Sequence, residues 1–259
     1  MEDVKIGIAL SGGGALGASH AGVLKALDEA GIKPHHITGV SAGAVVGSLY
    51  CSGNTPDKIL KLFDIKSLFE LFNLKSFTSG LVDTEYFRKI IRDNSQDDTF
   101  ESLKTKLSVG ATNLNTGAYE VFEKGQLSVA AGASMSVPLL MKPMRIGEHT
   151  YIDGGLINNL LVAPLLETCD FVIGVNAHYH KSLEKIDGLK GVAKRCFEII
   201  AWSSVRENGK KCDFLMEVEG THKYPLFDFD SSNDIFQIGY EEMKNKISEL
   251  EKQLPKKPN

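Results

Sequence analysis

The chain lacks the features that mark several specialised classes of protein. Its four cysteines are scattered, with no C-x-x-C pair and no histidine at metal-ligand spacing, so neither a disulfide framework nor a metal site is predicted. We expect all four to be small buried hydrophobes in a reducing compartment. A strong excess of charge is also missing. The net charge of −4 predicts no nucleic-acid partner.

Long hydrophobic runs are missing as well. The N-terminus has no basic segment followed by a long apolar one, so we expect no secretory signal and a cytoplasmic location. Residues 34–56 and 125–141 contain no Asp, Glu, Lys or Arg, but both are rich in small and polar residues. This composition indicates burial within a protein rather than a membrane span.

Short apolar segments alternate with helical patterns along the chain. Strands are predicted at 4–10, 37–40, 107–112, 119–123, 171–176 and 214–218. Helices are predicted at 15–30, 42–52, 84–92, 162–168, 191–207 and 234–254. The last of these has an apolar stripe that we expect to dock within the chain. This order predicts a single α/β domain over residues 1–254, with helices on the faces of a mostly parallel sheet, and a disordered tail at 255–259.

Residues 57–77 differ in composition from the rest of the chain. They contain four of the 13 phenylalanines and four lysines, spaced among leucines and isoleucines. One interpretation is an amphipathic helical cap that makes transient contact with a membrane surface. The other is a helical pair whose apolar face packs on the sheet, which is the usual fate of such a face.

Gly12 to Gly17 reads G-G-G-A-L-G between a predicted strand and a predicted helix. The pattern fits a dinucleotide-binding loop, but that loop needs an acidic residue at the tip of the second strand, and Ser41 stands there instead. A structural tight turn would also explain the glycines. The third interpretation is an oxyanion hole, in which the backbone N–H groups of Gly12, Gly13 and Gly14 stabilise negative charge.

Ser41 lies in Gly39-Val40-Ser41-Ala42-Gly43, which matches the G-x-S-x-G nucleophile elbow. The pattern alone is weak. Its context adds weight, because apolar residues precede it and a helix of small residues follows. We therefore predict that Ser41 is the nucleophile of a serine acyl-ester hydrolase.

Two kinds of base would activate Ser41. A Ser-His-Asp triad would use His178 or His180, which follow the strand predicted at 171–176. The alternative is Asp153, which stands at the end of an apolar strand and is followed by Gly154 and Gly155. An aspartate would need burial or a hydrogen bond to act as a base, since its reference pKa is about 3.9.

The motifs taken together resemble those of the patatin-like phospholipases. Gly12 to Gly17, Gly39 to Gly43 and Asp153-Gly154-Gly155 appear in that family's order, and residues 133–138 and Asn158-Asn159 resemble the blocks around its aspartate. The resemblance covers residues 4–176. It implies a patatin-like three-layer α/β/α fold, a Ser41–Asp153 dyad, an oxyanion hole at Gly12, Gly13 and Gly14, a lipid or acyl-ester substrate and no cofactor or metal. Gly17, Gly39, Gly43, Gly154 and Gly155 would support this site.

Leu16 and His20 both lie within the region of this resemblance. Leu16 stands where many members carry Arg or Lys, which removes a positive charge that would favour a phosphate headgroup. His20 matches a family histidine and is interpreted as a packing residue. Two rival functions remain: an acyltransferase, which would generally use a histidine and a carboxylate-binding arginine, and a non-enzymatic module that binds lipid or nucleotide.

Overall fold

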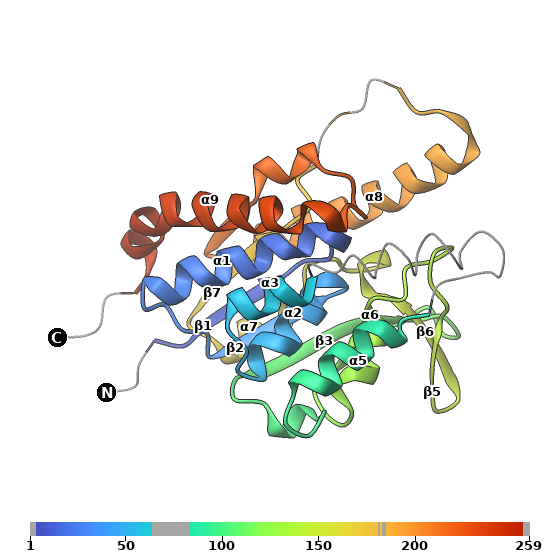
Figure 1. Ribbon diagram of the computed structural model, residues 1–259, viewed down its shortest axis with the longest axis horizontal. Helices are drawn as coiled ribbons and strands as arrows, with labels where there is room; N and C mark the ends of the chain where they lie inside the picture. The colour runs from blue at the N-terminus through green and yellow to red at the C-terminus, as the bar shows by residue number, and fades with distance from the viewer. Residues whose placement is uncertain (1–3, 64–82, 181, 183–184, 256–259) are drawn as a thin grey trace.

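A computed structural model describes residues 4–63, 83–180, 182 and 185–255 (Figure 1). Its eight-stranded sheet has the order β5-β6-β3-β2-β1-β7-β8, and β4 also pairs with β3. The strands are β1 Ile6–Leu10, β2 His36–Val40, β3 Lys106–Asn113, β4 Tyr119–Phe122, β5 Met144–Ile146, β6 His149–Asp153, β7 Phe171–Asn176 and β8 Phe214–Glu217. The run from β3 to β8 is parallel, whereas β4, β5 and β6 join it in antiparallel pairs.

Helices cover both faces of this sheet (Figure 1). They are α1 Ala18–Glu29, α2 Ala42–Cys51, α3 Pro56–Phe63, α5 Glu85–Asn94, α6 Leu127–Ser134, α7 Ala163–Thr168, α8 Gly188–Gly209 and α9 Ser232–Gln253. The predicted α/β architecture with a mostly parallel sheet between helices is therefore confirmed. None of the helices in the described residues is long and apolar enough to cross a membrane.

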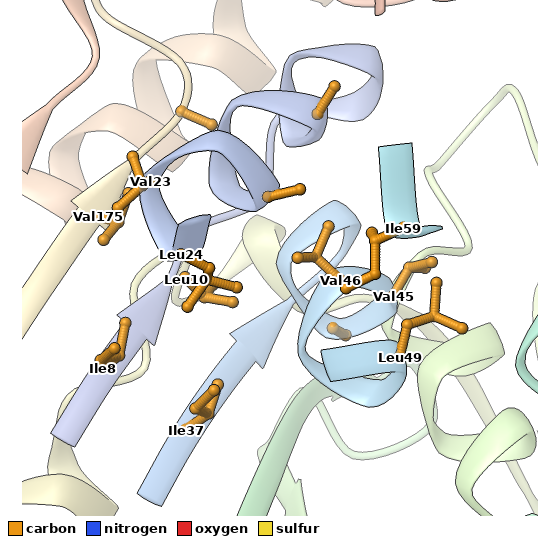
Figure 2. Close-up of a cluster of buried hydrophobic side chains, with 14 of the residues drawn as sticks. Ile8, Leu10, Val23, Leu24, Ile37, Val45, Val46, Leu49, Ile59 and Val175 are labelled. Atoms are coloured by element: carbon orange, nitrogen blue, oxygen red, sulfur yellow. The ribbon is translucent and has the colours of Figure 1, made fainter. Parts of the chain in front are cut away.

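The two faces of the sheet follow from the alternation of side chains along each strand. On β1, Ile8 and Leu10 belong to the main core beneath α1, α2 and α9, and Val175 of β7 joins them (Figure 2). Ala9 points the other way, into a smaller cluster with Leu165 of α7 and residues of β7 and α8. Because both faces are covered, the central strands read as continuous apolar runs.

Among the described helices, α1 and α9 make the most extensive contact with each other, and they lie side by side in Figure 1. The stripe predicted to dock within the chain does so, since Ile235, Met243 and Leu250 are fully buried. The two helices approach closely at Gly22 of α1 and Gly239 of α9. A Cβ on Gly22 would lie 2.1 Å from the backbone oxygen of Phe236 on α9.

Two strands, β2 and then β6, pair with the same edge of β3. Parallel β2 ends with Val40 opposite Gly110, and antiparallel β6 ends with Asp153 opposite the next residue, Ala111. Strand β4 pairs with β3 at both positions, so it occupies the other edge. The C-terminal ends of β2 and β6 therefore meet.

Several expectations from the sequence were wrong or fall outside the described residues. Helix α6 and strand β5 were not predicted. Of the four cysteines, all free, only Cys51 is buried, and Cys196 is exposed. Within the predicted cap at 57–77, residues 57–63 belong to α3 and the remainder lies outside the described residues, as does the predicted tail from residue 256 onward.

Candidate active site

Ser41 occupies a sharp turn between β2 and α2. Its backbone has φ 52° and ψ −120°, which is rare for a residue with a side chain. The next residue begins α2, so the free N–H groups and the positive end of the helix dipole lie beside Ser41. Ser41 is 6% exposed. This geometry is that of a nucleophile elbow.

Asp153 contacts Ser41 from the end of β6. The Ser41 hydroxyl donates a hydrogen bond of 2.6 Å to Asp153 Oδ2, and the Gly155 N–H donates one of 2.7 Å to Oδ1. Asp153 is 2% exposed. Burial raises the pKa of Asp153 to about 6, and the two hydrogen bonds oppose that rise. Such a carboxylate is ionised at neutral pH and remains basic enough to take a proton.

Neither histidine considered as a triad member forms a hydrogen bond with Ser41 in the described residues. His180 stacks on the Trp202 ring with centroids 4.0 Å apart, and its Nε2 lies 3.4 Å from the Arg195 guanidinium. His178 follows β7, and its backbone N–H donates to Asn176. The Ser41 hydroxyl itself donates to Asp153, so the described geometry brings together Ser41 and the aspartate rather than Ser41 and a histidine.

His20 lies fully buried on α1 behind the glycine loop. Its Nε2 is 2.8 Å from the Ser11 carbonyl oxygen, at the residue that precedes Gly12. Burial lowers the pKa of His20 to about 4, so the ring is neutral at physiological pH. Leu16 is also buried and belongs to the main core. These contacts place both side chains in the protein interior.

The three glycines of the loop have different backbone contacts. The Gly12 N–H donates to Asn159 Oδ1 at 3.1 Å, so it is already occupied. Neither Gly13 nor Gly14 donates an N–H to any acceptor among the described residues. Gly14 and Ser41 line the same pocket. Of the three N–H groups, those of Gly13 and Gly14 therefore have no acceptor in the described residues.

Close packing explains the other glycines of the motifs. A Cβ on Gly12 would lie 2.4 Å from Asn159 Oδ1 and 3.0 Å from Ser41 Cβ. A Cβ would also lie 2.6 Å or less from a neighbouring atom at each supporting position, namely Gly17, Gly39, Gly43, Gly154 and Gly155. At Gly43 and Gly154 that atom is a backbone oxygen, which cannot move aside without disturbing the sheet.

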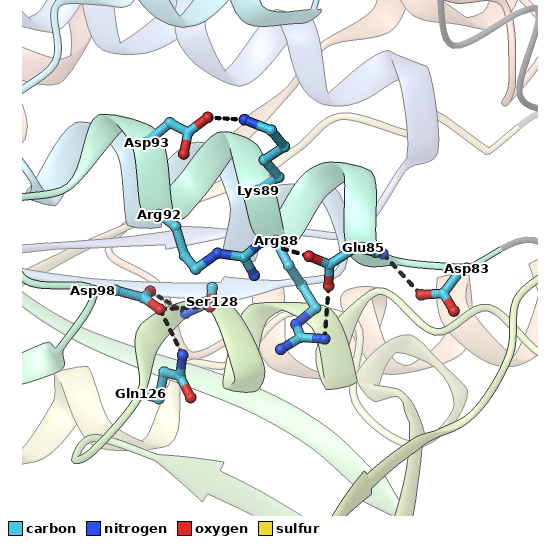
Figure 3. Close-up of polar contacts among 9 residues, drawn as sticks. All are labelled: Asp83, Glu85, Arg88, Lys89, Arg92, Asp93, Asp98, Gln126 and Ser128. Atoms are coloured by element: carbon cyan, nitrogen blue, oxygen red, sulfur yellow. Dashed lines mark hydrogen bonds and ion pairs between the residues drawn. The ribbon is translucent and has the colours of Figure 1, made fainter.

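Two polar side chains at this site had no role predicted from the sequence. Asn159 holds the glycine loop, as described above. Ser134, at the end of α6, accepts a hydrogen bond of 2.8 Å from the Ser41 N–H and donates one of 2.7 Å to the Gly110 oxygen. The start of α6 is fixed by Asp98, which accepts hydrogen bonds from the Ser128 N–H and hydroxyl (Figure 3). Helix α6 is thus fixed at one end and supports the elbow at the other.

A narrow pocket opens on Ser41. Apart from Gly14 and Ser41, its lining is apolar and comes from α2, α5, the segment after α6 and the segment before α9: Ala42, Val45, Phe87, Met135, Val137, Met141, Phe227 and Phe229. No charged residue of the described chain lines this pocket. Likewise, no group of three or more His, Cys, Asp or Glu side chains that could hold a metal ion occurs in the described part of the chain. The walls next to Ser41 are therefore apolar in the described residues.

Comparison with known proteins identifies relatives of part of this chain. The chain is 32% identical over 163 residues to neuropathy target esterase sws of Drosophila grimshawi and of Drosophila melanogaster, a match that spans 60% of this chain and 11% of each relative. The alignment therefore covers about a tenth of those proteins' length.

Solved structures share the fold at low sequence identity. VipD from Legionella pneumophila superposes with a TM-score of 0.64 at 16% identity, covering 96% of this chain and 67% of that one. Human GIVD cytosolic phospholipase A2 gives 0.51 at 9% identity, covering 96% and 58%. The family model described as patatin-like phospholipase matches residues 8–166, which include the glycine loop, Ser41 and Asp153. The chain belongs to the patatin-like phospholipase family.

Proposed function

We propose that this protein is a serine acyl-ester hydrolase that acts on lipids through a Ser41–Asp153 dyad. The observation that carries the proposal is the 2.6 Å hydrogen bond from Ser41 Oγ to a buried carboxylate whose pKa is raised to about 6. A positioned nucleophile and base within hydrogen-bond distance is the requirement for covalent acyl transfer. The family and the esterase and phospholipase names of the relatives support the same reaction class.

In the first half of the reaction, Asp153 takes the proton from Ser41 Oγ as that oxygen attacks the ester carbonyl carbon. The carbonyl oxygen becomes negatively charged and accepts hydrogen bonds from the N–H groups of Gly13 and Gly14. When the tetrahedral intermediate collapses, its carbon–oxygen bond to the alcohol breaks, and Asp153 returns the proton to the leaving alcohol. The acyl group remains bonded to Ser41 Oγ.

In the second half, water replaces the alcohol. Asp153 takes a proton from the water as its oxygen attacks the acyl carbon, and the same N–H groups hold the oxyanion. The intermediate then collapses with release of Ser41 Oγ, which regains the proton from Asp153. A fatty acid leaves, and the dyad returns to its starting state.

The pocket supports a lipid substrate over other esters. Its lining carries no charge in the described residues, so it favours contact with the hydrocarbon next to the ester carbonyl and gives no partner to a carboxylate-bearing acyl group. Leu16 lies in the core and supplies no positive charge near the glycine loop. We therefore assign recognition to the acyl chain rather than to a phosphate headgroup.

An acyl fluorophosphonate tests this proposal because it phosphonylates an activated serine. GIVD cytosolic phospholipase A2 was solved in complex with methyl γ-linolenyl fluorophosphonate, which makes that compound a suitable probe. We expect one adduct per wild-type chain, mapped by peptide mass spectrometry to Ser41, and none in Ser41→Ala. Absence of labelling in a folded wild-type sample would argue for a non-hydrolytic function, and labelling at another serine would refute the assignment of Ser41.

A further inference from the structure

Helix α8 has an apolar stripe on its solvent side. Leu189 is 86% exposed, Val192 is 48% exposed, and Ile199 and Ile200 are each 46% exposed. Cys196, also exposed, lies between them. Their spacing of three, four, three and one residues puts all five on one face of the helix. We call these five residues the α8 stripe.

The α8 stripe is not the face with which the helix packs on the protein. Ala201 and Val205 are buried, and Val205 joins the cluster beneath the sheet. On an ideal helix these packing residues point about 180° away from the stripe. An ordinary surface helix has its apolar residues on the packed side and polar residues outside. An apolar outer face on a helix marks a surface that meets an apolar partner.

The charge of α8 indicates which partner that is. Residues 188–209 contain four basic residues and two acidic ones, in a chain of net charge −4. Arg195 pairs with Glu198 and Arg206 with Glu207, so the excess of two positive charges comes from Lys190 and Lys194. An apolar stripe on a basic helix is the pattern of elements that lie in the plane of an anionic membrane. A second copy of this chain would present the same excess of positive charge on the facing helix, so the composition favours lipid.

The position of α8 relative to the active site fits this role. Its C-terminal half is fixed beside the glycine loop, because the Asn159 N–H donates 2.8 Å to Ser204 Oγ while Asn159 Oδ1 holds Gly12. Two further exposed apolar residues, Leu139 at 81% and Leu140 at 41%, stand between the pocket residues Val137 and Met141.

We propose that the α8 stripe docks this protein on an anionic phospholipid bilayer, with the stripe among the acyl chains. The choice of a bilayer as partner rests on the proposed function, since a hydrolase of lipid esters must reach its substrate at a membrane. The hydrogen bond from Asn159 to Ser204 links α8 to the residue that holds the glycine loop.

Vesicle co-sedimentation in a Ser41→Ala background tests the proposal without hydrolysis of the lipid. The probe is vesicles of phosphatidylcholine with 30 mol % phosphatidylserine, compared with phosphatidylcholine alone. We expect binding to the anionic vesicles, and a loss of affinity of at least about tenfold when Leu189, Ile199 and Ile200 are all replaced by Ser. Replacing Lys190 and Lys194 by Gln should weaken binding to the anionic vesicles by about tenfold as well.

The matched control replaces exposed apolar residues of similar exposure elsewhere, Leu114, Val121 and Leu166, by Ser. We expect this variant to bind as the parent does, and thermal melts should show that both triple variants are folded. The proposal is overturned if the parent does not bind, if the stripe variant binds as well as the parent, or if both triple variants lose affinity equally.

Sedimentation velocity tests the second-copy alternative. A parent dimer that the stripe variant converts to monomer, with vesicle binding unchanged, would overturn docking on lipid. The docking proposal and the hydrolase proposal can fail independently. Stripe-dependent vesicle binding without fluorophosphonate labelling of Ser41 would support the docking surface and refute the proposed hydrolase.

Discussion

Ser41 and Asp153 are 112 positions apart in the chain, yet their side-chain oxygens lie 2.6 Å apart. The contact depends on β3, whose neighbouring residues Gly110 and Ala111 pair with Val40 and Asp153. Backbone pairing of buried strands therefore sets the separation of Ser41 and Asp153, the proposed nucleophile and base. A site held in this way is preorganised before substrate binds.

The pH dependence of catalysis should report the ionisation of Asp153. Only the carboxylate can take the Ser41 proton, and burial raises the pKa of Asp153 to about 6. We expect kcat/KM for a soluble p-nitrophenyl ester to rise with pH through an apparent pKa near 6 and to level off above pH 7. Initial rates between pH 4.5 and 8.5 measure this, and a flat profile across that range would contradict the role of Asp153 as the base.

The same carboxylate should make folding stability depend on pH. Its folded pKa lies above the unfolded value, so its contribution to stability is fully present below about pH 4 and is lost as pH rises through 6. A shift of this size corresponds to at most about 3 kcal/mol. Asp153→Asn removes the titration, so we expect this variant to gain stability relative to wild type between pH 5 and pH 8.

Urea unfolding at several pH values would measure that difference. His20 and His36 titrate in both proteins and therefore cancel in the comparison; burial lowers the pKa of each to about 4. If the stability difference between wild type and Asp153→Asn is the same at pH 5 and pH 8, the buried carboxylate does not have the raised pKa described here.

Ser134 should act as a positioning residue. Its hydroxyl links the Ser41 N–H to the Gly110 oxygen, and Ser134→Ala removes both hydrogen bonds without touching substrate. We expect kcat to fall about 10- to 100-fold with KM nearly unchanged, because the elbow loses the partner that fixes Ser41. Steady-state kinetics on a soluble ester measure kcat and KM separately and so distinguish this outcome.

Ser136→Ala is the matched control for Ser134→Ala. Ser136 is equally buried, but its hydroxyl donates to the Gly132 carbonyl oxygen four residues earlier and has no bond to Ser41. Equal losses of kcat in the two variants would show that the effect is general packing damage rather than positioning of Ser41.

The α1–α9 contact should be sensitive to one methyl group. A Cβ on Gly22 would lie 2.1 Å from the Phe236 oxygen, so Gly22→Ala must separate the helices and should cost about 1–3 kcal/mol in the free energy of unfolding. Gly191→Ala is the control, because a Cβ there has ordinary space in α8. Chemical denaturation should find that control neutral or slightly stabilised; equal destabilisation of both would contradict the close packing.

The sequence predicted the elements with clear periodicity and missed those without it. Residues 171–176 form β7 as predicted, because no polar residue interrupts that run before Asn176. Helix α6 consists of small residues with no apolar stripe, so no periodic signal marks it. Strand β5 has three residues, too few to show alternation.

At the site, the motifs located Ser41, Asp153 and the glycine loop, since these residues need particular neighbours in sequence. The roles of Ser134 and Asn159 depend on contacts with residues far away along the chain, which no local pattern records. Periodicity predicted a helix at 191–207 but could not say that apolar residues line its outer face as well. That distinction depends on which side of α8 the sheet covers.

The most direct test of the dyad compares three variants in hydrolysis of p-nitrophenyl butyrate. Asp153→Asn keeps the shape of the side chain but cannot accept the Ser41 proton, whereas His178→Ala and His180→Ala remove the alternative bases. We predict that kcat/KM falls by at least about 10³-fold in Asp153→Asn and by less than about threefold in either histidine variant. Retained activity in Asp153→Asn together with loss in a histidine variant would show that a triad operates and would contradict this account.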